Sequence, residues 1–135
     1  MTTAKHLGML VMAASMAVSA TAARAETLSF TADLLAVAGT DSKATGKVSA
    51  DYDTDSNKLT WRGEYDGITS YATSAGIYNQ DNQIVVPFRS VDSPFDGTAI
   101  VAKQQTPDLR AGRWFVLIRS AKFPNGELRG SLTLN

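Results

Sequence analysis

Apolar and polar residues alternate along most of this chain from residue 27 onward, and a helical period is nearly absent. Alternation at every second residue is typical of a β-strand with one buried face. The segment 27–34 shows the pattern most clearly, with Leu28, Phe30 and Leu34 on one side and threonine, serine and aspartate on the other. We therefore predict a half-buried first strand in this segment.

The same alternation predicts the remaining strands. The runs 48–52 and 59–65 flank a polar stretch and indicate a hairpin. Further strands are expected at 75–77, 84–88, 98–102, 114–118 and 128–134. Pro87 cannot donate to a ladder, so we expect it at a sheet edge or at the end of its strand. The run 114–118 is apolar at successive positions, and we expect its strand to be central and covered on both faces.

About eight short strands, with no room for crossover helices, favour an antiparallel β-sandwich of the immunoglobulin-like Greek-key type. A closed barrel is the alternative. Thr106-Pro107-Asp108 is the one helix-start signal, with the threonine hydroxyl expected to cap a helix that Gly112 stops after barely a turn. Trp61 and Trp114 are in phase with inward apolar residues, so we assign both to the core rather than to a sugar-stacking surface.

The first 25 residues have the composition of an export signal. Lys5 gives a positive start, residues 7–20 are apolar or small, and Ala23-Arg24-Ala25 has small residues at the two positions that a signal peptidase reads. The apolar run is shorter than the about 20 residues that span a bilayer. We expect cleavage after Ala25 and a secreted or periplasmic domain at residues 26–135, with no integral membrane segment in the mature chain.

Removal of this segment changes the chemistry that remains. His6 is the only histidine and there is no cysteine, so residues 26–135 contain neither. Without Lys5 and Arg24, 11 of the 13 basic residues face 13 acidic ones, a formal net charge of −2. Nucleic acids and anionic lipids select basic surfaces, and we expect neither as a partner. The usual nucleophilic triads are unavailable.

Several short motifs occur in a fixed order over most of the mature chain. They are Gly39–Gly46, Tyr52–Thr54, Leu59–Trp61, Tyr65–Thr69, Ser93–Gly97, Leu109–Val116 and the closing Gly126–Gly130. In this order they resemble the CHRD domain, which is named for its repeats in the developmental antagonist chordin and is also found in exported bacterial proteins. The resemblance implies an exported β-domain of the stand-alone bacterial form, and it implies no reaction.

The chain departs from that family at its histidines. Family members typically carry Ala-His-x-His in the middle of the domain and Asn-x-His-Thr in the penultimate strand. Here the corresponding stretches are Ala75-Gly76-Ile77-Tyr78 and Leu117-Ile118-Arg119-Ser120. The resemblance therefore implies that Gly76, Tyr78 and Arg119 replace three histidines, so that no imidazole-based metal site or proton chemistry operates here. Whether function is lost or changed stays open.

The closing hairpin carries the candidate site. Glu127 and Arg129 are two residues apart on a predicted strand and so share a face, and Arg119 on the facing strand is placed to join them. One interpretation is a structural network in which the two guanidinium groups neutralise a buried Glu127. The other is a recognition patch of Tyr78, Arg119, Glu127 and Arg129, which presents an aromatic ring and bidentate donors to a ligand carboxylate or sugar.

Asp51, Asp53 and Asp55 form a weak calcium candidate, because alternating carboxylates in a loop supply the oxygen ligands that Ca²⁺ needs. The flanks are strands, and the glycine and glutamate of an EF-hand are missing. We favour a hairpin turn whose acidic side chains bond their own backbone. We assign no metal and no cofactor.

These patterns favour a non-enzymatic exported or envelope-associated module that recognises a polypeptide or glycan through one sheet face or the loops beyond it. The alternative is a structural or matrix component that acts by self-association. The third interpretation, a glycosidase, needs a carboxylate pair. Only Glu64 and Glu127 remain besides Glu26, and pairing of Glu127 with arginine would lower its pKa rather than raise it. The sequence leaves the ligand and the oligomeric state open.

Overall fold

The computed structural model describes residues 26–135, and the expected export signal at 1–25 lies outside the described residues. The chain forms nine strands and two short helical turns in that part. They are β1 (Thr27–Ala36), β2 (Thr45–Asp53), β3 (Lys58–Asp66), β4 (Ala72–Tyr78), β5 (Ile84–Pro87), β6 (Phe95–Ile100), η1 (Lys103–Gln105), α1 (Thr106–Arg110), β7 (Phe115–Ser120), β8 (Leu128–Ser131) and β9 (Thr133–Leu134). The predicted all-β class is confirmed.

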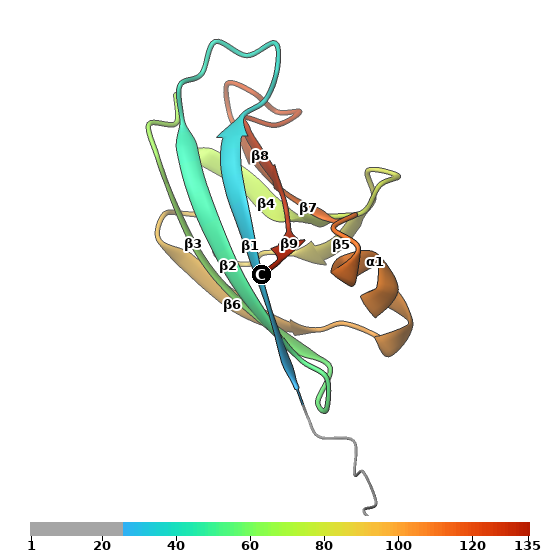
Figure 1. Cartoon of the computed structure of the whole chain (residues 1–135). Helices are drawn as coiled ribbons and strands as arrows, with labels where there is room; N and C mark the ends of the chain where they lie inside the picture. Colours follow the sequence, from blue (N-terminus) through green and yellow to red (C-terminus); the bar gives the residue numbers. More distant parts are fainter. Residues whose placement is uncertain (1–25) are drawn as a thin grey trace, which may run out of the picture.

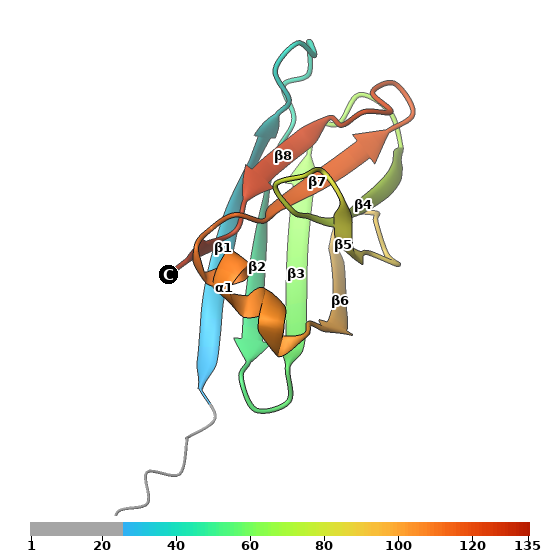
Figure 2. The ribbon, with the colours of Figure 1, turned by 90° about the vertical axis from the view of Figure 1, so that its right-hand side faces the viewer.

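The strands form one antiparallel sheet in the order β5-β4-β7-β8-β1-β2-β3-β6, and β9 pairs with β1. This sheet curls round until it is nearly closed, with β5 and β6 as its two edges (Figures 1 and 2). A sandwich of two separate sheets is not confirmed, because β8 pairs directly with β1 through Leu35 and Arg129. The architecture is closer to the barrel alternative, left open between β5 and β6.

The inward faces of the strands meet in one core, as the alternation predicts. Phe30, Ala32 and Leu34 of β1 are each at most 1 % exposed. Trp61 and Trp114 are 3 % and 2 % exposed, which confirms that both belong to the core. The core therefore runs the length of the curled sheet.

The strand β7 is central, as expected, and lies between β4 and β8. Its inward residues Val116 and Ile118 join the main core, while Phe115 and Leu117 are buried in a second cluster with Tyr78. Both faces of β7 are thus covered. Pro87 ends the edge strand β5. At this position its lack of an N–H costs the sheet no ladder hydrogen bond.

The short helix α1 lies at one end of the sheet (Figures 1 and 2), and its Leu109 is fully buried in the core. The expected threonine cap is wrong in detail. Gln105 is the N-cap residue and makes no side-chain cap, while the Thr106 hydroxyl donates to the carbonyl of Lys103 at 2.8 Å. The preceding η1 turn supplies that carbonyl. Gly112 follows the helix with φ of 73°, a conformation that favours glycine.

Candidate functional site

Four side chains from β4, β7 and β8 stack on the outer face of the sheet. The Tyr78 and Phe115 rings lie 5.7 Å apart at an angle of 16°. The Arg119 guanidinium lies 5.5 Å from the Tyr78 ring centre, and the Arg129 guanidinium lies 3.9 Å from the Phe115 ring centre. With Leu117 they form what we call the arginine–aromatic face. Cation–π attraction holds each guanidinium against a ring.

The two rings are buried beneath the two arginines. Tyr78 and Phe115 are 7 % and 4 % exposed, whereas Arg119 is half-buried and Arg129 is exposed. The structure therefore brings together Tyr78, Arg119 and Arg129, and it leaves Glu127 of the predicted patch outside this face. It does not present the Tyr78 ring as a contact surface. Tyr78 instead supports the guanidinium that faces solvent.

Neither arginine of this face has an acidic partner among the described residues. The described ion pairs are Arg62–Asp51, Arg110–Glu26, Arg113–Asp108 and Lys122–Asp41. Arg119 donates one hydrogen bond from Nη1 to the Pro124 carbonyl at 3.1 Å, and its buried Nε has no partner. The face thus holds two positive charges and spare N–H donors over an apolar base.

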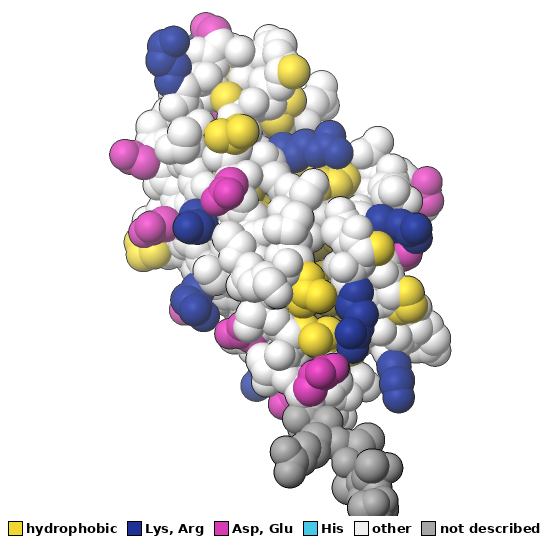
Figure 3. Space-filling view, viewed as in Figure 1, with side chains coloured by type: hydrophobic (Ala, Val, Ile, Leu, Met, Phe, Trp, Pro, Cys, Tyr) yellow, Lys and Arg dark blue, Asp and Glu magenta, His cyan; other side chains and the backbone are white. Residues whose placement is uncertain are grey.

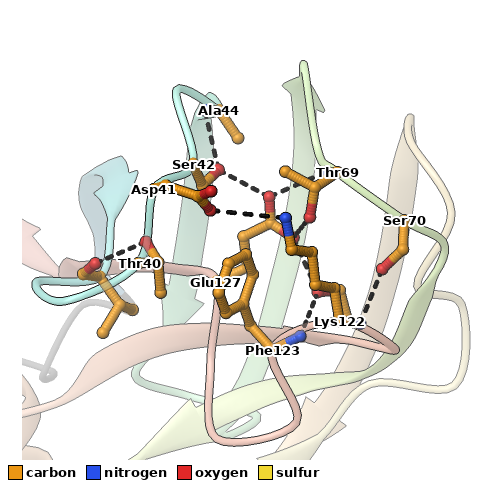
Figure 4. A network of polar contacts seen from close by, with 11 residues as sticks. Thr40, Asp41, Ser42, Ala44, Thr69, Ser70, Lys122, Phe123 and Glu127 are labelled. Atoms are coloured by element: carbon orange, nitrogen blue, oxygen red, sulfur yellow. Dashed lines mark hydrogen bonds and ion pairs between the residues drawn. The ribbon is translucent and has the colours of Figure 1, made fainter.

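Glu127 lies directly before β8 and forms no ion pair with these arginines. It is fully buried and its carboxylate accepts four hydrogen bonds (Figure 4). Oε2 accepts from the Ser42 hydroxyl at 2.6 Å and from the Thr69 amide at 2.9 Å. Oε1 accepts from the Ser120 hydroxyl at 2.7 Å and from the Thr69 hydroxyl at 3.0 Å. We call Glu127 together with its donors Ser42, Thr69 and Ser120 the Glu127 cradle.

The expected pairing of Glu127 with Arg119 and Arg129 is wrong. Glu127 precedes the regular part of β8 and follows Gly126, whose φ is 129°, so strand alternation does not fix its direction. Burial raises the pKa of the Glu127 carboxyl, but the bonds from Ser42, Ser120 and Thr69 outweigh it and hold that pKa below its usual value. The carboxylate is buried, and hydrogen bonds rather than an ion pair within residues 26–135 stabilise its charge.

The positions that the family resemblance relates to histidines lie on the outer face of β4 and β7. Gly76 is in register with Leu117, and Tyr78 contacts Arg119. A Cβ at position 76 would lie 2.7 Å from the Val86 carbonyl oxygen and 2.9 Å from Ile84 Cδ1. The neighbouring strand β5 therefore occupies the space that any larger side chain at this position would need.

Within the acidic run at the β2–β3 turn, Asp53 bonds the turn backbone, as the hairpin interpretation predicts. Asp53 Oδ1 accepts from the amides of Asp55 and Ser56 at 2.8 and 3.3 Å. Asp51 accepts from the Ser29 hydroxyl at 2.8 Å. Within residues 26–135, no three acidic side chains gather in a way that suits a metal ion.

Charged side chains elsewhere are mixed in sign. On the face shown in Figure 3, basic, acidic and apolar side chains are interspersed. An open hollow of about 420 Å³ on the outside of β2, β3 and β6 has two basic and two acidic side chains in its lining, those of Lys47, Arg62, Glu64 and Asp96. This hollow is charge-balanced, unlike the arginine–aromatic face.

The fold and these sites define a class: a small, nearly closed antiparallel β-domain, with a buried carboxylate at one end and a cationic patch on its side. The CHRD domain model matches residues 26–132, so the chain belongs to the CHRD domain family. No curated protein and no solved structure matches the chain. Membership points in general to an extracellular or binding module of a non-catalytic kind. No helix within the described part of the chain is long and apolar enough to cross a membrane.

The sequence interpretation missed several residues of these sites. Ser42, Thr69 and Ser120 belong to the cradle, and the first two lie within motifs that carry the family resemblance. Their hydroxyl side chains in or beside the expected turns are the signal that could have indicated them. Phe115 was also missed, although its outward phase in an apolar strand indicated a partner on that face.

Proposed function

We propose that this protein is an exported, non-enzymatic binding module whose arginine–aromatic face recognises a polypeptide or glycan that carries carboxylates. One observation supports this above the others: Arg119 and Arg129 lie on buried rings without an acidic partner in the described chain. Guanidinium groups in this arrangement suit bidentate bonds to carboxylates. Export rests on the signal-like segment 1–25 and on the family.

The aromatic base gives the face its rigidity. Each guanidinium is held in place by a ring before a ligand arrives, so less side-chain entropy is lost on binding. Arg119 is also tethered to the Pro124 carbonyl through Nη1 and its Nε is buried, so its free Nη donors are the ones offered to a ligand. A lysine at either position would keep the charge and lose the planar fork.

Binding of poly-L-glutamate and of polygalacturonate, measured by titration calorimetry at low ionic strength, tests the proposal. The methyl ester of polygalacturonate is the neutral control. We expect the double variant Arg119→Gln/Arg129→Gln to bind at least tenfold more weakly, which corresponds to about 1.4 kcal/mol. We also expect affinity to fall as salt is added.

The control variant is Arg62→Gln/Arg110→Gln, which removes the same charge from exposed ion pairs elsewhere. It should bind as the unmodified protein does. Equal losses of affinity in both double variants would show that binding depends on net charge alone and not on this face. Absence of binding to both acidic polymers would contradict the proposal. Thermal melts of both variants show whether the fold is retained.

A further inference from the structure

The two edges of the sheet, β5 and β6, border a groove of about 680 Å³. Its lining includes Trp61 of β3, Pro87 of β5, and Asp96, Gly97, Thr98 and Ile100 of β6. It shares no residue with the arginine–aromatic face. What this groove accepts depends on the main-chain groups along its walls.

The hydrogen-bond register shows which groups of β6 face the groove. The amide of Val101 donates to the Asn57 carbonyl at 2.8 Å, directly beyond the β3–β6 ladder. Because bonded and non-bonded pairs alternate in an antiparallel ladder, Gly97 and Ala99 turn their main-chain groups toward β3. Asp96, Thr98 and Ile100 turn theirs away from it, and β6 pairs with no second strand among those described.

The opposite wall offers less to a partner. The amide of Phe88 donates to the Ala75 carbonyl at 2.9 Å, so the alternation directs the main chain of Pro87 toward the groove. Proline has no N–H, and a proline on an edge is a common protection against strand addition. The edge of β6 carries no such protection.

The base of the groove is already sealed by side chains. Phe88 stacks on Trp61 with ring centres 4.6 Å apart. Gly97 lies so close to Trp61 that an added Cβ would be 2.4 Å from the indole ring. The core is therefore closed without a further strand, while Ile100 of β6 remains 70 % exposed beside the groove.

We propose that the β6 edge docks an extended polypeptide, which adds as a strand and bonds to the main chain of Asp96, Thr98 and Ile100. Donors and acceptors at every second residue match an extended main chain, and strand addition is an established mode of peptide recognition. Alternate apolar side chains of the partner cover Ile100 and the groove wall. Because like charges opposite each other are unfavourable, the residue facing Asp96 is neutral or basic.

The test uses a synthetic peptide of alternating valine and threonine with one terminal lysine, titrated into isotope-labelled protein and followed by NMR. We expect the amide signals of Asp96, Thr98 and Ile100 to shift and to exchange more slowly with solvent, and those of Gly97 and Ala99 to change less. A peptide N-methylated at every second amide should bind at least tenfold more weakly. Thr98→Pro removes one outward N–H and should weaken binding to a similar degree, whereas Thr98→Val should not.

Three results would overturn the proposal. The first is no change in the β6 amides at millimolar peptide. The second is equal binding of the N-methylated peptide, which would show that main-chain bonds are not used. The third is a concentration-dependent dimer that Thr98→Pro abolishes and that the peptide does not displace, which would assign the edge to a second copy of this chain. If Thr98→Pro does not fold, the comparison of the plain and N-methylated peptides on the unmodified protein tests the proposal by itself.

Discussion

Glu127 is the residue on which one end of the domain depends. Its four donors come from the β1–β2 connection, the β3–β4 connection and the end of β7. One buried carboxylate therefore ties three segments that are far apart in the sequence. The ion pair of Lys122 with Asp41, at 3.6 Å, lies near the cradle but is exposed and adds little (Figure 4).

Removal of the Glu127 carboxylate should destabilise the protein strongly. Glu127→Ala leaves the Thr69 amide and three hydroxyls without their acceptor, and we expect a loss of roughly 3 kcal/mol or more in the free energy of unfolding. Glu127→Gln keeps one acceptor oxygen and should lose about 1–2 kcal/mol. Urea unfolding measures both, with the exposed Glu64→Ala as a control expected to change it by less than about 0.5 kcal/mol. A small effect of Glu127→Ala would refute the role of the cradle.

The same carboxylate makes stability depend on pH in a defined range. Folding lowers the pKa of Glu127 from its ordinary value of 4.5, so folding favours the charged form. Its contribution is fully present above that value and is lost as the pH falls through the lower pKa of the folded state. We expect the stability difference between the unmodified protein and Glu127→Gln to be constant above about pH 5 and to shrink in more acidic solution. A difference that stays constant down to the acid transition would contradict this.

At the scale of the elements, side chains of neighbouring strands cover the outer face of β7. Arg129 of β8 covers Phe115 of β7 at 3.9 Å. A double-mutant cycle of Arg129→Ala and Phe115→Leu should give a coupling of about 0.5–1 kcal/mol in unfolding free energy. Additive effects would show that the stacked geometry contributes no energy of its own.

Strand β6 depends in turn on one glycine. A Cβ at Gly97 would meet the Trp61 indole at 2.4 Å, so Gly97→Ala must push β6 away from the core. We expect a loss of about 1–3 kcal/mol, the usual effect of overpacking, and an altered near-UV signal from Trp61. Asp96→Ala, at the exposed neighbouring position, serves as the control. An unchanged melting temperature for Gly97→Ala would show that the strand yields easily.

Strand positions were predictable because alternation is a local property. Segment 27–34 shows it directly and became a strand with the expected buried face. The continuous apolar run 114–118 is equally local, and most of it became β7, which is buried on both faces. The direction of Glu127 was not predictable, since it depends on Gly126 and on hydroxyls from distant loops. The pairing of β8 with β1, which decides between a sandwich and a nearly closed sheet, is likewise set by contacts that no local pattern contains.

The whole molecule is closed by its last strands. β8 joins β7 to β1, and β9 with Asn135 extends the pairing along β1, where the Asn135 amide donates to the Ser29 carbonyl at 2.9 Å. Leu128 and Leu132 are fully buried at this junction. The first strand of the fold therefore has a complete set of neighbours only after the final residues have been added.

This closure predicts different outcomes for two truncations. Ending the chain after Leu132 removes only exposed pairing with β1, and the protein should keep a cooperative unfolding transition with a loss of about 1–2 kcal/mol. Ending it after Gly126 removes Glu127, Leu128 and Leu132 together, and so leaves β1 and β7 without the strand between them. We expect no cooperative transition in that case, because both the core and the cradle are opened. Calorimetry of the two purified forms distinguishes these outcomes, and a cooperative transition in the shorter form would show that the sheet is held by its first seven strands alone.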